Sequence, residues 1–394
     1  MKETVIASAV RTPFGTYGGS LKDVPAVNLG AIAIREAVKR AGVDPEKIDY
    51  LFMGMVVQAG AGQVPSRQAG LKAGLPPEVP SDTINKVCAS SLRAVNLGDA
   101  LIRAGDARIV VAGGMESMSR TPYILEQARW GYRLGHAPLV DAMVKDGLWC
   151  PACDCHMGVL GHEVAKEFGI TREEQDRWAL RSHQRAIAAI DSGKFKDETT
   201  PVEIPQRKGP PAVFAVDEHP RRDTSLEKLA ALKPAFQPDG TVTAGNAPGL
   251  NDGGAAIVLL HPDVARAMGI KPLATIVAQG QASVQPRYLN TVPAVAARAA
   301  LERAGLKAED MDLIEVNEAF AAVALTAIKV GEWDPEKVNV NGGAVALGHP
   351  IGASGARILM TLIYELRRRG GGLGLATICS GMAQGEATIV RVEP

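Results

Sequence analysis

The sequence contains little of what several protein classes require. Only five of its 394 residues are cysteines, irregularly spaced, so no disulfide framework is indicated and a reducing cytoplasm is the expected location. Basic and acidic residues balance at 43 each, which indicates neither a nucleic-acid nor a membrane-surface partner. No apolar run reaches membrane-spanning length, and the first residues enter a strand pattern directly, which predicts no signal or transit peptide.

What the sequence does contain is an alternation of apolar, β-branched segments with amphipathic ones. Such alternation predicts an α/β fold in which helices cover mixed sheets. Aromatic residues are few while Ala and Gly are many, which fits helices packed closely on a sheet. We predict strands at residues 4–9, 108–112 and 375–379, and helices at residues 89–103, 172–192 and 351–369.

Two parts of the chain resemble each other. Residues 31–49 (AIAIREAVKRAGVDPEKID) match residues 294–312 (AVAARAALERAGLKAEDMD), and VVAGGM at 110–115 echoes TICSGM at 377–382. This predicts two copies of one α/β domain, the alternative being convergent Ala-rich helices. Pro, Gly and charges accumulate between them, so we expect an N-terminal domain (1–118 with 246–270), an inserted loop domain (119–245) and a C-terminal domain (271–394).

Four short motifs carry the candidate chemistry: residues 85–91 (NKVCASS), 317–320 (NEAF), 348–355 (GHPIGASG) and 379–381 (CSG). Cys88 precedes a predicted helix, whose N-terminus favours a thiolate. His349 is expected to open a second helix with Pro350 at its first position, and Cys379 ends an apolar strand. Each residue has an ordinary alternative as a core cysteine or a helix cap. Together, one cysteine that holds an acyl group and another that removes a carbon-bound proton suit carbon–carbon bond chemistry beside a thioester.

The four motifs resemble those of the thiolase family, and the resemblance covers essentially the whole chain. Further matches lie at residues 9–15 (AVRTPFG), 156–158 (HMG), 246–253 (NAPGLNDG) and 342–357 (GGAVALGHPIGASGAR). The resemblance implies an α/β fold of duplicated βαβαβαββ domains that form a layered α-β-α-β-α core with an inserted loop domain.

The resemblance also implies a ping-pong mechanism. Cys88 would be the nucleophile that carries the acetyl group, and His349 would take its proton. Cys379 would be the base that removes the α-proton of a second acetyl-CoA. His349 and a water held by Asn317 would bind the enolate oxygen, while the backbone N–H groups of Cys88 and Gly381 would bind the oxyanion of the tetrahedral intermediate.

For the substrate, the resemblance implies coenzyme A thioesters, with no cofactor and no metal. Arg221 would lie at the nucleotide end of coenzyme A, and Phe236 and Phe320 would flank the pantetheine and acyl path. Ala247 belongs to the pantetheine-side segment. His156 and Met157 occur in the form found in acetoacetyl-CoA thiolases, which favours a short acyl group.

The expected reaction is the reversible condensation of two acetyl-CoA to acetoacetyl-CoA and CoA. The nearest alternative is a broad-chain 3-ketoacyl-CoA thiolase of fatty-acid breakdown; remoter ones are a decarboxylating ketoacyl synthase and a non-catalytic acyl-CoA or lipid-binding protein. The resemblance also implies a homotetramer, or else a dimer, with Tyr123, Trp130 and Tyr132 of residues 122–139 at the interface. The alternative is that these aromatics cover a small core of the insertion itself.

Some positions depart from the family pattern. Met382 and Ala383 replace glycines after Gly381 and adopt positive φ less readily. Ser91 adds a hydroxyl expected near the acyl site, and Pro248 replaces a serine that contacts pantetheine.

Residues 150–156 (CPACDCH) are also unusual beside the family, and a zinc site, a redox-active pair and plain packing all remain open. The substrate role implied for His156 argues against its binding a metal. The remaining histidines, at positions 136, 162, 183, 219 and 261, are expected on the surface or as helix caps.

Overall fold

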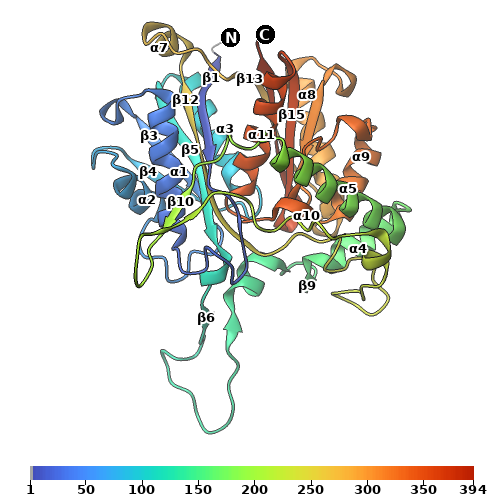
Figure 1. Cartoon of the computed structure of the whole chain (residues 1–394). Helices are drawn as coiled ribbons and strands as arrows, with labels where there is room; N and C mark the ends of the chain where they lie inside the picture. The colour runs from blue at the N-terminus through green and yellow to red at the C-terminus, as the bar shows by residue number, and fades with distance from the viewer. Residues whose placement is uncertain (1–2) are drawn as a thin grey trace.

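The computed structural model describes residues 3–394 (Figure 1). The N-terminal half contributes strands β1 (Thr4–Arg11), β2 (Gly15–Thr16), β3 (Tyr50–Gly54), β4 (Ser81–Ile84), β5 (Ile109–Ser117) and β12 (Asn251–Leu260). The C-terminal half contributes β13 (Ala274–Ser283), β14 (Leu313–Val316), β15 (Gly372–Ser380) and β16 (Gln384–Val392). These strands form one ten-stranded sheet in the order β14-β15-β16-β13-β1-β12-β5-β3-β4, with β2 beside β12.

The strand order repeats from the centre of this sheet outward. β1 pairs antiparallel with β12, β12 antiparallel with β5, and β5 parallel with β3. In the same way, β13 pairs antiparallel with β16, β16 antiparallel with β15, and β15 parallel with β14. Even the irregularities correspond, because the register shifts between Ile6 and Ser8 in β1 and between Ile276 and Ala278 in β13. The repeated topology confirms the predicted fold class.

Helices form three layers around the two halves of the sheet (Figure 1). The outer helices of the N-terminal half are α1 (Ala26–Ala41) and α2 (Pro65–Ala73), and those of the C-terminal half are α8 (Val292–Ala304) and α9 (Ala321–Gly331). Between the halves, α3 (Ser90–Ala104) packs against α11 (Ser354–Arg368). Two short helices remain: α7 (Pro262–Ala267) follows β12, and α10 (Ala344–Leu347) precedes α11.

The predicted end of a helix is confirmed where a residue at that position itself stops the helix. α3 ends before Gly105, whose φ of 92° suits only glycine well, as the sequence predicts. By contrast, α11 begins at Ser354 rather than at residue 351, and Pro350 is not its first residue. The backbone turns there, because the Pro350 carbonyl accepts the N–H groups of Ala353 and Ser354 at 2.8 and 3.1 Å.

Glycines allow the segments that lead into the central helices to touch backbone to backbone. A Cβ on Gly114 of β5 would lie 1.9 Å from the carbonyl oxygen of Gly352, and a Cβ on Gly355 would lie 2.6 Å from the amide nitrogen of Leu92. Both separations are far below van der Waals contact, so a side chain at Gly355 would force α3 and α11 apart, and one at Gly114 would push β5 away from the turn before α11.

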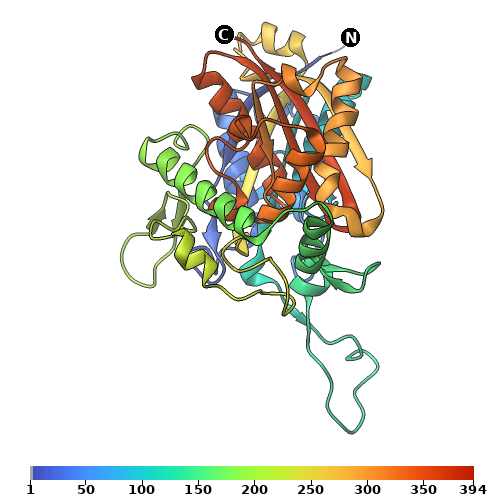
Figure 2. The ribbon, with the colours of Figure 1, turned by 90° about the vertical axis from the view of Figure 1, so that its right-hand side faces the viewer.

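The insertion between β5 and β12 extends over one end of the molecule (Figures 1 and 2). Its elements are β6 (Tyr123–Ile124), β7 (Val140–Asp141), β8 (Trp149–Cys150), β9 (Cys155–His156), α4 (Met157–Glu167), α5 (Arg172–Asp191), β10 (Val202–Ile204), β11 (Ala212–Phe214) and α6 (Leu226–Ala230). Residues 122–139 project away from the body as a long arm (Figure 2), on which Trp130 is 82% exposed. The aromatics of the arm therefore do not cover a core of the insertion. Among residues 3–394, no helix is long and apolar enough to cross a bilayer.

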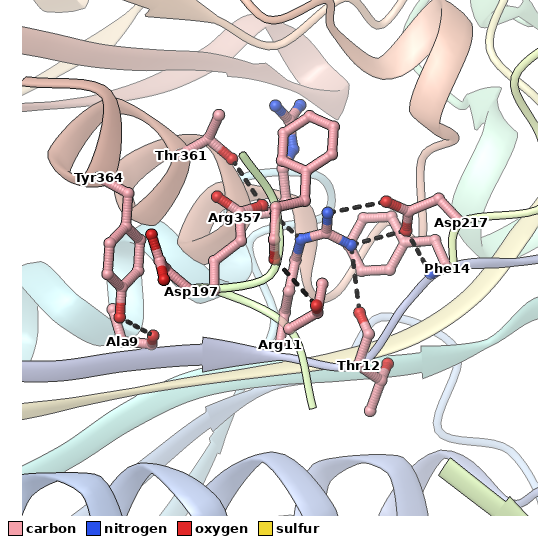
Figure 3. A network of polar contacts seen from close by, with 12 residues as sticks. Ala9, Arg11, Thr12, Phe14, Asp197, Asp217, Arg357, Thr361 and Tyr364 are labelled. Carbon is pink, nitrogen blue, oxygen red and sulfur yellow. Dashed lines mark hydrogen bonds and ion pairs between the residues drawn. The ribbon is translucent and has the colours of Figure 1, made fainter. Parts of the chain in front are cut away.

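A buried ionic network fastens the insertion to the first strand (Figure 3). The Nε of Arg11 lies 2.7 Å from Oε1 of Glu198, and its two terminal nitrogens lie 2.6 and 2.8 Å from the oxygens of Asp217. All three side chains are almost fully shielded from solvent. The two carboxylates raise the pKa of Arg11 further above its usual value even though burial opposes its charge.

Replacing Arg11 with alanine should destabilise the fold strongly, because it leaves two buried carboxylates without their cation. We expect the free energy of unfolding to fall by about 3–5 kcal/mol in urea denaturation. The matched control is Arg177→Ala, which removes an exposed pair with Glu173 and should cost less than about 1 kcal/mol. Equal effects of the two variants would contradict a structural role for the network.

Candidate active site

Ten of the predicted site residues line one cavity of about 500 Å³: Cys88, His156, Met157, Arg221, Phe236, Ala247, Phe320, His349, Cys379 and Gly381. The eleventh, Asn317, lies behind His349 and hydrogen-bonds to it. A larger cavity of about 660 Å³, beside Ser8, Arg40 and Tyr364, is lined by no cysteine or histidine. The residues with nucleophilic and basic side chains thus meet in a single, mostly apolar chamber.

Cys88 is held at the start of α3 by a tight turn. Val87 has a φ of 43°, and the Ser90 hydroxyl closes the turn by donating to the Val87 carbonyl at 2.6 Å. The backbone N–H groups of Cys88 and Gly381 both act on the Cys88 sulfur, as expected of an oxyanion site. Burial nevertheless dominates and raises the pKa of the Cys88 thiol to about 12, with Glu116 adding to the rise. The backbone N–H groups thus favour the thiolate, as the sequence predicts, but burial opposes it more strongly in the free protein.

His349 is buried, and its ring is fixed on both sides. Nδ1 lies 2.6 Å from the Ser354 hydroxyl, which also lies 3.0 Å from the Pro350 carbonyl that it can donate to. On the other side, Nδ2 of Asn317 lies 3.4 Å from Nε2 and can only donate. We therefore assign the proton to Nδ1, which leaves Nε2 as the basic nitrogen. Burial, followed by the charge of Arg357, lowers the pKa of His349 to about 3.

Asn317 and Glu318, the two polar residues of the segment 317–320, have different hydrogen-bond partners. Oδ1 of Asn317 has no hydrogen-bond partner among the described residues although the side chain is fully buried, so a water at this atom would satisfy it. The carboxylate of Glu318 accepts hydrogen bonds from Trp178 and Ser182 of α5, at 2.9 and 2.7 Å, and from the backbone N–H of Val345 at 3.0 Å. Glu318 is thus a buried link between α5 and α10 rather than a cap for its own helix.

Cys379 ends β15 and is 1% exposed. Burial, followed by the neighbouring Cys88, raises the pKa of its thiol well above the usual value, so the two sulfurs lie within electrostatic reach of each other. Beyond Gly381, both Met382 and Ala383 adopt left-handed φ angles, 62° and 49°. Both residues therefore adopt a backbone conformation that glycine adopts more easily, at the cost of some backbone strain.

Aromatic rings wall the acyl side of the cavity. The ring of His156 stacks on Phe236 with centroids 4.3 Å apart, and Phe236 meets Phe320 edge to face at 6.0 Å. Nδ1 of His156 accepts the Gly158 N–H at 3.0 Å, which turns Nε2 away from α4. Burial lowers the pKa of His156, so its imidazole is neutral at pH 7. Arg221, in contrast, is exposed where the cavity reaches the surface.

Ser91 and the cysteines of the β8–β9 hairpin take part in packing and hydrogen bonding within the fold. The Ser91 hydroxyl does not line the cavity; it accepts the Ala356 N–H at 2.9 Å and so joins α3 to α11, contrary to expectation. Cys150 pairs with Cys155 across the β8–β9 hairpin and packs with Cys153 in an apolar cluster. Within residues 3–394, no group of three or more His, Cys, Asp or Glu side chains is arranged to hold a metal.

Three histidines that were predicted on the surface or at helix caps are positioned differently. His162 is buried inside α4, where its Nδ1 accepts the Thr241 N–H at 3.1 Å. His219 lines the cavity, and its Nδ1 lies 2.9 Å from the Ala346 carbonyl. His183 is 3% exposed and accepts the Arg221 N–H at 3.1 Å. No local signal could have revealed this, because the contacts join segments more than 35 residues apart. His261 does cap α7 as predicted, by accepting the Asp263 N–H.

Known proteins resemble this chain over its whole length. The thiolase N-terminal domain matches residues 4–263, and the thiolase C-terminal domain matches residues 270–392. An acetyl-CoA acetyltransferase of Pseudomonas aeruginosa is 52% identical over 392 residues, which cover 99% of this chain and 100% of that protein. One of Escherichia coli is 51% identical over 392 residues, 99% of each. The crystal structure of the Bacillus anthracis acetyl-CoA acetyltransferase aligns with a TM-score of 0.97 at 46% identity, covering 100% of this chain and 99% of that one.

The raised pKa of Cys88 predicts how its alkylation depends on pH. Because only the thiolate reacts, the rate with iodoacetamide should rise about tenfold per pH unit from pH 7 to 9 without reaching a plateau. Mass spectrometry of the Cys88 peptide measures the rate, and a small free thiol in the same buffers serves as the control. A plateau near neutral pH would reveal a preformed thiolate–imidazolium pair and contradict the neutral one.

Proposed function

The chain belongs to the thiolase family and is an enzyme of that type, and from this premise we propose that it is an acetyl-CoA acetyltransferase. It would condense two acetyl-CoA to acetoacetyl-CoA and CoA, and catalyse the reverse cleavage, without a metal or a further cofactor. The observation that supports this most directly is the meeting of Cys88, His349 and Cys379 in one cavity. Relatives of about half-identical sequence carry the same name over the full chain length.

Acyl transfer would begin at the neutral Cys88–His349 pair. Nε2 of His349 takes the Cys88 proton as the sulfur attacks the thioester carbonyl, so charge develops only as the bond forms. The backbone N–H groups of Cys88 and Gly381 then stabilise the oxyanion. The CoA sulfur would leave with the proton of the Cys379 thiol, which lies in the same cavity, so this step ends with acetyl-Cys88, a Cys379 thiolate and a His349 ring that is protonated at Nε2.

Carbon–carbon bond formation would need the second cysteine. The Cys379 thiolate that remains after CoA has left is a strong base because its thiol has a raised pKa, and it removes the α-proton of the second acetyl-CoA. A hydrogen-bond donor at His349 Nε2 and a water on Asn317 would hold the enolate oxygen. The enolate carbon attacks acetyl-Cys88, and the Cys88 sulfur leaves and takes back the proton from Nε2 of His349. Cys379 keeps the α-proton, so acetoacetyl-CoA is released from an enzyme in its starting protonation state.

The wall around the acyl site favours a short chain. Phe236 contacts the rings of both His156 and Phe320, and these three side chains line the cavity together with the catalytic cysteines. A broad-chain 3-ketoacyl-CoA thiolase is the competing assignment, since Pro248 in the cavity wall departs from the family pattern. Cytoplasmic location fits the five cysteines, all of which are free.

Thiolytic cleavage rates decide between the two assignments. The purified enzyme should have a higher kcat/KM for acetoacetyl-CoA than for a long-chain 3-ketoacyl-CoA, because the aromatic wall leaves little room beyond a short acyl group. A clear preference for the long chain would favour the broad-chain assignment.

The two cysteines should be separable by half-reactions. Cys379→Ala should still gain an acetyl group on Cys88 from acetyl-CoA, seen by intact mass, while condensation falls by about 10²–10⁴-fold. Cys88→Ala should gain none, and Cys153→Ala, which alters a thiol outside the cavity, should behave as the unaltered enzyme. If Cys379→Ala condensed a malonyl thioester at full rate, the enzyme would instead be a decarboxylating ketoacyl synthase.

For assembly, a homotetramer built as a dimer of dimers is the arrangement that the projecting arm favours. Trp130 and Leu134 on this arm are 82% and fully exposed, and exposed apolar side chains of this size mark contact surfaces. Light scattering should therefore show a tetramer that Trp130→Ser with Leu134→Ser converts to a dimer. Val213→Ser, at an exposed apolar residue off the arm, should have no effect. A monomer would contradict both the tetramer and the dimer.

A further inference from the structure

His219 places a polar atom in the wall of the active-site cavity that the mechanism does not use. The residue lies in the insertion between β11 and α6. A Cβ on Gly249 would lie 2.4 Å from Nε2 of His219 and 3.1 Å from Oδ1 of Asn251. Asn251 in turn accepts the backbone N–H of His349 at 2.9 Å, so Nε2 of His219 lies next to the segment that holds the catalytic histidine.

The protonation state of His219 follows from its single hydrogen bond. The Ala346 carbonyl 2.9 Å from Nδ1 can only accept, so Nδ1 carries the proton. Burial, as the largest effect, lowers the pKa of His219, which keeps the ring neutral at pH 7. Nε2 therefore presents a lone pair, and it forms no hydrogen bond with any residue that the structure describes.

The residues of the cavity wall beside Nε2 of His219 provide no hydrogen-bond donor for it. Gly249 has no side chain, and Pro248 lacks a backbone N–H. The nearest charged side chain of the cavity lining is Arg221, two residues further along the chain and exposed at the surface. Since an acceptor in an apolar wall is costly when unpaired, a donor has to come from water or from a ligand.

We propose that Nε2 of His219 accepts a hydrogen bond from an amide N–H of the pantetheine arm of the CoA thioester. This inference rests on the proposed function. A CoA thioester that reaches from Cys88 to Arg221 passes the wall formed by Gly249 and His219 with its pantetheine portion, which contains two amide groups. The acetyl group has no hydrogen-bond donor, and the other donors of the molecule, the pantoyl hydroxyl, the ribose 2′-hydroxyl and the adenine amino group, lie further from the sulfur than the two amides. His219 would therefore be a binding residue for the arm and not a catalytic residue.

The test is His219→Phe, which keeps a flat ring but removes the acceptor. A lost hydrogen bond of about 0.5–1.5 kcal/mol predicts that KM rises about two- to tenfold for both acetyl-CoA and S-acetyl-pantetheine, with kcat nearly unchanged. His261→Phe is the matched control, because His261 caps α7 by accepting the Asp263 N–H and does not line the cavity; its KM values should not change.

Each other outcome overturns the proposal. A KM increase confined to acetyl-CoA would move the contact to the nucleotide, and a fall in kcat at constant KM would make His219 a support for the His349 segment. Should His219→Phe unfold, His219→Gln retains an acceptor and should keep the KM for S-acetyl-pantetheine within about threefold of the unaltered enzyme; a larger rise would again count against the contact. Failure of the proposed function is distinguishable, because the unaltered enzyme would then turn over neither substrate.

Discussion

The close contact between the starts of α3 and α11 is the constraint on which the active site depends. Cys88 precedes one of these helices and His349 precedes the other, and the residues come from different halves of a duplicated fold. The approach of α3 to α11 requires glycine at Gly355, and the Ser91 hydroxyl of α3 accepts the Ala356 N–H of α11. Gly114 lets β5 contact the turn before α11 at Gly352. The pseudo-symmetric sheet thus brings the N-termini of two helices, and with them Cys88 and His349, to one cavity.

Burial determines the electrostatic state of this cavity. The pKa of the Cys88 thiol is raised to about 12 and that of His349 lowered to about 3, so both groups are neutral before substrate arrives. Neutral groups are inexpensive to bury, whereas an ion pair in the same place would need compensating partners. The backbone donors at Cys88 and Gly381 are then available for charge that appears only during the reaction.

The insertion between β5 and β12 contributes residues to the active-site cavity, as the two halves of the fold do. Arg11 anchors it to β1 through Glu198 and Asp217, and Glu318 anchors α5 to the segment that precedes His349. These are buried, multiply bonded charges, which hold position well because losing any partner leaves another group unsatisfied. The aromatic wall and His219 therefore have fixed positions opposite the cysteines.

The sequence by itself determined the alternation of strands and helices, the end of α3 at Gly105 and ten of the residues that line the cavity, because these depend on local patterns and on motifs that resemble a family. Only the tertiary structure decided that Pro350 turns the chain before α11 begins, that Ser91 joins two helices and that His219 faces the cavity. It also reversed the expected effect on Cys88, whose helix terminus favours the thiolate but whose burial opposes it more strongly. Desolvation and packing arise from residues far apart in the chain, so no local pattern contains them.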